Sequence, residues 1–401
     1  MQKLFISQKI ILISVFSVLT FNFCNCQWII SSNGFGNNNF VYSLLPVNNS
    51  IFMGSTGVYI STNNGNYWSQ TTFDSLSVSA LALKENTIFA CTYTNGVHYS
   101  TNYGSTWLQT QSSFSDIWSL TVSGNNIIAG TTTGLYLTSN NGQNWNQNAL
   151  TNIVINTLIS DGNIVFAGTY YNGVYKSTNY GFNWVQTSLN NQTVWSFAIN
   201  GSNLYAGTRY NGIFLSTNNG TDWIQTGMNN QTVLSIALYG ANILAGTYQN
   251  GVFYSTNNGI SWNQKNDGFS TTPSINSLLI FNNFIFAGTQ GQSIWKRLIS
   301  DFVTVQNVSQ DLPGNYLLKQ NYPNPFNPNT NIGYNIKQNS EIKIVIYDLL
   351  GKEISIPVNE KQSPGEYEFN FDGSALNSGI YFYSLYVNGK LIENKRMVLL
   401  K

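Results

Sequence analysis

The chain has 401 residues, of which only 8% are charged, and its net charge is +1 at neutral pH. Globular proteins usually carry about a quarter charged residues, so this chain lacks the basic face that nucleic acids and anionic lipids require. Asn, Ser, Thr and Tyr supply the polarity instead, which suits uncharged partners such as glycans. A genome that favours Asn, Ile, Lys and Tyr codons would produce the same bias, so both explanations stay open.

The first 26 residues have the features of an export signal. Lys3 and Lys9 give the first residues a positive charge, and residues 10–23 are mainly apolar. Cys24-Asn-Cys26 then precedes an expected cleavage before Gln27. The apolar run is too short to span a membrane, and no second run occurs, so no transmembrane segment is expected in the mature chain. Lipoprotein-type processing at Cys24 or Cys26 is the alternative.

An eight-residue pattern, Ser/Thr-x-Asn-x-Gly-x-x-Trp, recurs six times at intervals of 38 or 39 residues. A repeat of this period is typical of solenoids and propellers. The Asn is expected to bond its own backbone two residues on, and the Gly to supply a positive φ. We call this pattern the box; its copies lie at 61–68, 100–107, 138–145, 177–184, 216–223 and 255–262.

Around each box, four short β-branched and aromatic runs predict antiparallel strands, as at 194–199, 203–208, 212–216 and 223–226. The second strand, which reads like Ala-Gly-Thr, occurs seven times, whereas the box occurs six times. We therefore predict that residues 27–30 pair into the last unit and close a ring. Closure of this kind protects sheet edges.

The boxes resemble the Asp-box, or bacterial neuraminidase (BNR), repeat, with Asn where that family usually has Asp. The resemblance implies an all-β fold: a seven-bladed β-propeller over 27–300, closed by its N-terminal strand, with the boxes away from the ligand-binding side. Sialidase-like sites use three arginines, but residues 27–300 contain only Arg209 and Arg297. Sialidase activity is therefore not expected.

The cysteines, the histidine and the acidic residues of the sequence give little support for another catalytic site or for a metal site. After signal removal Cys91 is the one remaining cysteine, so neither a disulfide nor a cysteine metal site can form. The single histidine, His98, is expected to pack within a third strand. We predict no catalytic residue, no metal and no cofactor. The alternative is a hydrolase of neutral polysaccharides that uses two loop carboxylates, such as Asp74 and Asp116, with Asp267 as a further candidate.

A binding rim is predicted on the propeller face opposite the boxes. Tyrosines precede Asn-Gly in several second-to-third-strand turns, and both residues of that pair are expected at positive φ. Trp residues begin two first strands at the channel mouth, where other units have Tyr42 or Leu234. Flat aromatic faces with amide donors suit sugars or peptides, although packing between blades would also explain them. The candidate binding residues are Tyr93, Trp118, Tyr170, Tyr171, Trp195, Arg209, Tyr210 and Tyr248.

Residues 301–316 read as a linker, and alternating strands between Gly and Pro breaks from 317 to 401 predict a small immunoglobulin-like β-sandwich. This segment resembles the type A C-terminal sorting domain of the type IX secretion system of Bacteroidetes. The resemblance rests on an Ile-Tyr-Asp-Leu-Leu-Gly-Lys turn, a Ser-Gly-Ile-Tyr-Phe-Tyr strand, a basic end and an opening motif. The motif residues are Asn321, Tyr322, Pro323, Asn324, Pro325, Phe326, Asn327 and Pro328.

The resemblance implies export through the periplasm, recognition by the outer-membrane machinery and its sortase-like peptidase, and a secreted or cell-surface location. We therefore expect a monomeric propeller cargo that binds glycan or a surface protein and does not bind nucleic acid. A structural or adhesive surface protein without a small ligand is a third possibility.

Overall fold

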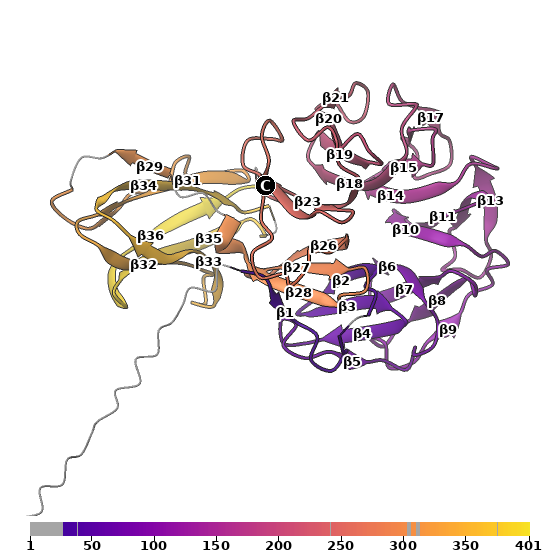
Figure 1. The fold of residues 1–401 in the computed structure, drawn as a ribbon, viewed down its shortest axis with the longest axis horizontal. Helices are drawn as coiled ribbons and strands as arrows, with labels where there is room; N and C mark the ends of the chain where they lie inside the picture. Colours follow the sequence, from indigo (N-terminus) through magenta and orange to yellow (C-terminus); the bar gives the residue numbers. More distant parts are fainter. Residues whose placement is uncertain (1–26, 38, 241, 303–305, 310–312, 375) are drawn as a thin grey trace, which may run out of the picture.

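The computed structural model describes residues 27–37, 39–240, 242–302, 306–309, 313–374 and 376–401. The expected export signal, 1–26, lies outside the described residues. Seven four-stranded sheets form a ring of blades, and two further four-stranded sheets form a sandwich beside it (Figure 1). The predicted all-β fold, a seven-bladed propeller with a small C-terminal sandwich, is confirmed.

Each blade is a meander whose strands follow in chain order from the channel outward. Blades 1 to 3 comprise β2 (Ser43–Val47), β3 (Ser50–Ser55), β4 (Gly57–Ser61), β5 (Ser69–Gln70); β6 (Val78–Lys84), β7 (Thr87–Thr92), β8 (Val97–Ser100), β9 (Leu108–Gln109); and β10 (Ile117–Ser123), β11 (Asn126–Thr131), β12 (Gly134–Thr138), β13 (Asn146–Ala149). Blades 4 to 6 comprise β14 (Ile155–Asp161), β15 (Ile164–Thr169), β16 (Val174–Ser177), β17 (Val185–Gln186); β18 (Val194–Asn200), β19 (Asn203–Thr208), β20 (Ile213–Ser216), β21 (Ile224–Gln225); and β22 (Val233–Tyr239), β23 (Asn242–Thr247), β24 (Gly251–Ser255), β25 (Asn263–Gln264).

Blade 7 is completed from the other end of the chain, as predicted. Its strands are β26 (Ile275–Phe281), β27 (Phe284–Thr289), β28 (Ile294–Leu298) and β1 (Ile29–Ile30). Ile29 pairs with Lys296 and Ile30 with Trp295. Trp28 is 1% exposed and stacks on Phe269 at 5.1 Å, so it anchors the closing strand in the same way as a box Trp.

Glycine in the second strand lets neighbouring blades approach closely. A Cβ on Gly207 would lie 2.8 Å from Val233, which begins the first strand of the next blade. The glycines at the matching positions of five other blades meet a Val or Ile of the next blade in the same way. In blade 2 this position holds Cys91, a free and fully buried thiol whose pKa is raised by burial.

The box is a self-contained turn whose hydrogen bonds differ from those predicted. Ser216 Oγ accepts the Gly220 N–H at 2.8 Å and donates to Asn218 Oδ1 at 2.9 Å. Asn218 Oδ1 accepts the N–H of Asp222, four residues on, instead of two, at 2.9 Å. The other five boxes repeat this pattern, and the positive φ predicted for the box glycine is present in all six.

The C-terminal sandwich contains the sheets β29–β34–β31–β30 and β33–β32–β35–β36. Their bounds are β29 (Gln306–Ser309), β30 (Leu317–Leu318), β31 (Asn329–Ile336), β32 (Ser340–Tyr347), β33 (Glu353–Gln362), β34 (Gly365–Asp372), β35 (Gly379–Val387) and β36 (Lys390–Leu399).

Part of the expected linker, 301–316, has regular structure. The 3-10 helix η1 (Ile299–Phe302) ends inside it, and Phe302 is buried against the propeller. Strand β29 pairs with β34 of the sandwich. Backbone pairing at a sheet edge depends weakly on side chains, so the polar sequence of β29 did not reveal it.

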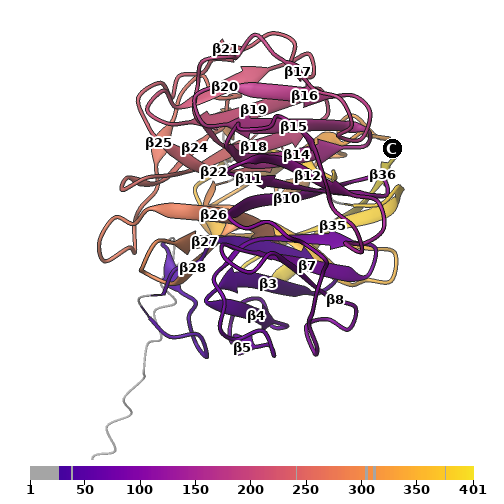
Figure 2. The same cartoon turned by 90° about the vertical axis from the view of Figure 1, so that its right-hand side faces the viewer.

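The sandwich contacts the propeller on the side of the first-to-second-strand turns. The Gly240 N–H, in the β22–β23 turn, donates to Asp372 Oδ2 at 2.8 Å. Burial raises the pKa of neighbouring Tyr239 to about 12. In Figure 2 the sandwich lies behind the propeller, whose strands are stacked in front of it. The predicted binding rim belongs to the opposite ends of the blades.

Candidate functional site

The two channel-mouth tryptophans are aimed by β-bulges. The pairing of β10 with β11 skips Trp118 between Ile117 and Ser119, and the pairing of β18 with β19 skips Trp195 in the same way. A bulge leaves its extra residue unpaired and redirects its side chain. Trp118 is 38% exposed although it lies within a strand, so its ring faces the solvent at the mouth.

A continuous arc of rings crosses the channel mouth. Phe40 stacks on Tyr42 at 6.1 Å, and Tyr42 meets Tyr93 edge to face at 5.8 Å. Tyr93 meets Trp118 at 5.4 Å, and Trp118 meets Trp195 at 6.5 Å. Burial raises the pKa of Tyr93 to about 12, with Tyr42 adding to the shift. We call these five residues the aromatic arc; Phe40 is its one member that the sequence analysis did not consider.

Trp118 of blade 3 and Trp195 of blade 5 meet across blade 4, because blade 4 carries a smaller side chain at the matching position. At the matching position it carries Asn156, which is buried and donates to the Val194 carbonyl at 3.1 Å. Ser79 in blade 2 likewise donates to the next blade, at Ile117. The second residue of a blade's first strand therefore has one of two roles. Small polar residues at this position join neighbouring blades, whereas aromatic residues line the channel mouth.

A second group of predicted residues lies in the turns of blades 4 and 5. Arg209 Nη1 donates to Tyr170 Oη at 3.1 Å, and Tyr170 Oη donates to Tyr171 Oη at 3.3 Å. The guanidinium also lies over the Tyr210 ring at 4.8 Å. The bond to Tyr171, helped by that from Arg209, lowers the pKa of Tyr170, and the bond from Tyr170 raises the pKa of Tyr171. We call these four residues the Tyr–Arg cluster.

The cluster adjoins the arc. The backbone N–H of Arg209 donates to the carbonyl of Thr193, two residues before Trp195, at 2.9 Å. Tyr248 has an exposed ring, but within the described part of the chain it makes no ring contact with the arc or the cluster. The structure thus brings seven of the eight predicted rim residues into two adjoining groups.

The turns that carry the cluster differ from the predicted conformation. Positive φ occurs at the glycine and at the residue before the asparagine, as in Tyr171 (73°) and Tyr210 (74°), instead of at the asparagine. Left-handed tyrosines also occur in boxes, at Tyr103 and Tyr180, so this conformation does not distinguish the rim.

A recurring glutamine fixes these turns, and the sequence analysis missed it. Gln186 and Gln225, in the outer strands of blades 4 and 5, donate to the carbonyls of Asn172 and Asn211 at 2.8 and 2.9 Å. Asn211 in turn donates to Gln192, in the loop between those blades, at 2.7 Å. The signal was present, because Gln follows the box Trp by two residues in every unit.

The loop carboxylates have different surroundings. Asp267 lies 3.7 Å from the buried Arg297 and its carbonyl accepts the Trp28 N–H, so it belongs to the closing strand. Asp116 lies beside the arc, with its N–H bonded to the Tyr93 carbonyl.

No group of three or more His, Cys, Asp or Glu suited to a metal occurs in the described ranges. His98 is 8% exposed and packs edge to face on Phe73 at 4.9 Å, and burial lowers its pKa. It is a packing residue, as predicted.

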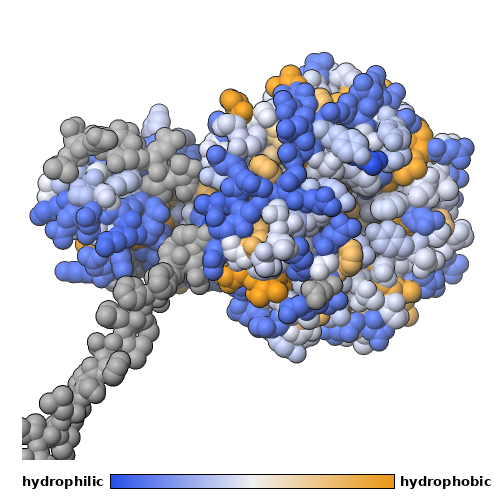
Figure 3. All heavy atoms as spheres, in the orientation of Figure 1, coloured by the Kyte–Doolittle hydropathy of each residue, from blue (hydrophilic) through white to orange (hydrophobic). Residues whose placement is uncertain are grey.

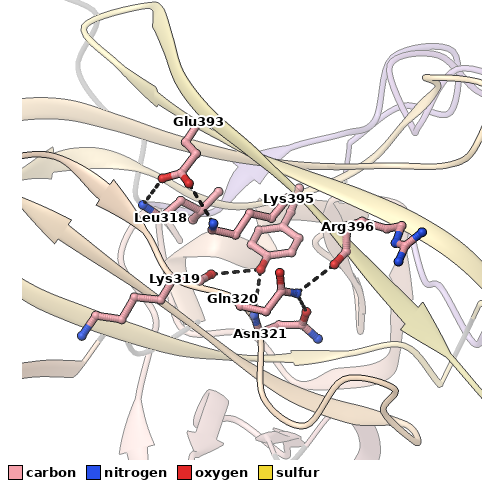
Figure 4. A network of polar contacts seen from close by, with 8 residues as sticks. Leu318, Lys319, Gln320, Asn321, Glu393, Lys395 and Arg396 are labelled. Atoms are coloured by element: carbon pink, nitrogen blue, oxygen red, sulfur yellow. Dashed lines mark hydrogen bonds and ion pairs between the residues drawn. The ribbon is translucent and has the colours of Figure 1, made fainter.

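In the sandwich, the opening motif and the residues just before it contact the last strand, β36; Figure 4 shows the contacts of the preceding residues. Gln320 donates to the Arg396 carbonyl at 2.8 Å, and Asn324 Oδ1 accepts the Val398 N–H at 2.9 Å. The Phe326 N–H donates to Val398, and its carbonyl accepts the Leu400 N–H. The motif thus attaches the C-terminal residues to the start of the domain.

The motif side chains divide into buried and exposed ones. Asn321 and Phe326 are each 2% exposed, whereas Tyr322 is 81% exposed. The Asn321 N–H donates to Tyr383 Oη at 2.7 Å, and Tyr383 donates to the Lys319 carbonyl at 2.9 Å. These bonds hold Asn321 in the core, whereas most of the other motif side chains are exposed.

The propeller face in Figure 3 is a mosaic of hydrophilic, intermediate and hydrophobic side chains, without one continuous apolar area. No described helix is long and apolar enough to cross a membrane.

Residues 320–399 match the family described as the secretion system C-terminal sorting domain. The chain is therefore a type IX secretion cargo with a β-propeller fold, secreted or displayed at the cell surface. No curated protein matches at a significant level.

Solved structures share the fold. An extracellular domain assigned to a hybrid two-component system of B. thetaiotaomicron is 19% identical, with a TM-score of 0.57 over 77% of this chain and 46% of that one. PorZ, a surface component of the type IX secretion system of Porphyromonas gingivalis, is 13% identical, with a TM-score of 0.55 over 93% and 61%. A GH74 xyloglucanase from Xanthomonas campestris is 13% identical, with a TM-score of 0.55 over 77% and 59%. This chain spans less than two thirds of each; these likenesses establish the fold alone.

Proposed function

We propose that the propeller is a non-catalytic module that binds an extended glycan along its aromatic rim. The observation that carries the proposal is the aromatic arc, five rings in sequential contact across four blades. Sugar rings present apolar faces and hydroxyl edges, which match flat aromatic faces with polar tips. The low overall charge and the mixed surface favour such a ligand over one that is held by many ion pairs.

Affinity electrophoresis of the purified secreted chain tests this proposal. The panel comprises soluble neutral and acidic polysaccharides, including xyloglucan, and each incubation is also assayed for released reducing ends. We expect retardation without product, and its loss in Trp195→Ala. Trp262→Ala, on the box side, is the matched control and should bind normally if it remains folded. Absence of retardation by every polymer would contradict glycan binding.

Hydrolysis is the second candidate, because Asp116 lies beside the arc. Retaining and inverting glycosidases need two carboxyl groups about 5–9.5 Å apart, and Asp74, in the loop before blade 2, is the candidate partner of Asp116. Product that disappears in Asp116→Asn, while retardation persists, would replace the binding proposal with a hydrolase.

A further inference from the structure

We propose that the Tyr–Arg cluster is a subsite for a sugar carboxylate, so that the rim selects a uronate-containing glycan. This inference rests on the proposed glycan function and adds the ligand's charge. The cluster lies at the end of the arc, where a sugar held by Trp195 would extend toward Arg209.

The first support is an unneutralised cation. The ion pairs of the described residues involve Arg297, Lys319 and Lys395, and none involves Arg209. Its contacts with Tyr170 and Tyr210 leave part of its five N–H donors available. A guanidinium binds a planar carboxylate through two parallel hydrogen bonds, which is its strongest pairing.

The second support is the number of donors in the cluster. Tyr170 accepts from Arg209, and the bond between Tyr170 and Tyr171 uses one of their two hydroxyl protons, so the other proton remains for an outside acceptor. Together with the guanidinium, this hydroxyl forms a set of donors that has no ion pair with a carboxylate among the described residues. Such a set favours an anionic oxygen over a neutral hydroxyl.

The third support is that the cluster is held in place before any ligand arrives. The N–H groups of Tyr171 and Tyr210 both donate to threonine hydroxyls of the next loop, Thr193 and Thr232, at 3.2 Å. Both rings nevertheless remain exposed, at 61% and 63%. Rigid backbones under exposed aromatic rings reduce the entropy lost on binding.

Titration calorimetry at low salt tests the subsite with three oligosaccharides of equal length: a uronic acid oligomer, its carboxyl-reduced neutral counterpart and a sulfated neutral oligomer. We expect the uronate to bind at least about tenfold more tightly than the reduced form, because charge-assisted hydrogen bonds are roughly twice as strong as neutral ones. Arg209→Met should abolish this preference, whereas Arg209→Lys should retain part of it.

Lys265→Met is the matched control, because Lys265 follows the outer strand of blade 6, where its backbone bonds Trp28 and Val252. Its loss should leave the preference intact. Equal affinity for the uronate and its reduced form would overturn the inference while leaving glycan binding in place. Arg209-dependent binding of the sulfated oligomer alone would overturn the choice of carboxylate. Binding of no glycan at all would overturn the proposed function itself.

Discussion

The two faces of the propeller both consist of repeated turns, yet their sequences have different explanations. In the boxes, the Ser or Thr, Asn and Gly are used by the turn itself, through the same three hydrogen bonds in all six copies. In the rim turns, the backbone is fixed by glutamines and threonines from elsewhere, so Tyr170, Arg209 and Tyr210 are not needed for the turn. Repetition by itself therefore indicates folding, and side chains that the turn does not use are the better guide to binding.

The largest expected effect concerns a tryptophan on the box side. Trp28→Ala should destabilise the chain by about 3–5 kcal/mol, because it empties a buried site against Phe269 and loosens the closing strand. Trp195→Ala should cost less than about 1.5 kcal/mol, since its ring contact lies at the open mouth. Urea unfolding of both variants measures the difference; equal losses would mean that the rim tryptophan is a core residue.

A smaller loss is expected within a single box. Ser216→Ala leaves the buried Gly220 N–H without its acceptor and should cost about 1–3 kcal/mol. Ser188→Ala, whose exposed hydroxyl donates to Thr221, is the comparison and should cost under about 0.5 kcal/mol. Thermal melts of the two variants give the result, and a Ser216 variant as stable as the parent would contradict our account of the box.

The glutamines test whether rigidity serves binding. Gln225→Ala removes the support of the Arg209 turn, and Gln264→Ala removes the same bond, to Asn250, beneath the separate Tyr248 turn. Each should destabilise by about 0.5–1.5 kcal/mol, but only Gln225→Ala should weaken glycan affinity, by a few-fold. Calorimetry with the polymer that binds most tightly in the panel measures these affinities. Equal affinities of Gln225→Ala and the parent would show that the turn holds its shape without the glutamine.

The smallest expected effect is on a titration. The pKa of Tyr170 is lowered by its bonds with Tyr171 and Arg209, so Tyr171→Phe and Arg209→Met should each raise it. Ionised Tyr170 should therefore appear at lower pH in the parent than in either variant. Tyrosine ring-carbon NMR across alkaline pH measures this, with Lys176→Met on the box side as the control. An unchanged midpoint in both variants would mean that the three groups are not coupled in solution.

Local patterns in the sequence were enough to predict the blades, their number and the ring closure, because each strand and each box glycine is determined within a few residues. Contacts across the ring were not predictable. Trp118 and Trp195 meet because blade 4 carries the small Asn156 between them, which requires knowledge of the channel's geometry. The left-handed φ of Tyr171 was missed because Asn-Gly is the commoner hairpin signal, whereas here an outside threonine holds the preceding residue.

The pairing of Ile29 with Lys296 has a consequence for how the chain reaches its final state. Contacts between distant parts of a sequence form late, because their loop entropy is lost before neighbouring contacts compensate. Blades 1 to 6 can assemble from local hairpins, whereas the N-terminal strand, which leaves the ribosome first, must wait until blade 7 has been made. A nascent or exported chain is therefore an open, edge-exposed arc until its beginning returns. We expect proteolysis just after Ile30 to give the native protein that same unsealed, aggregation-prone form.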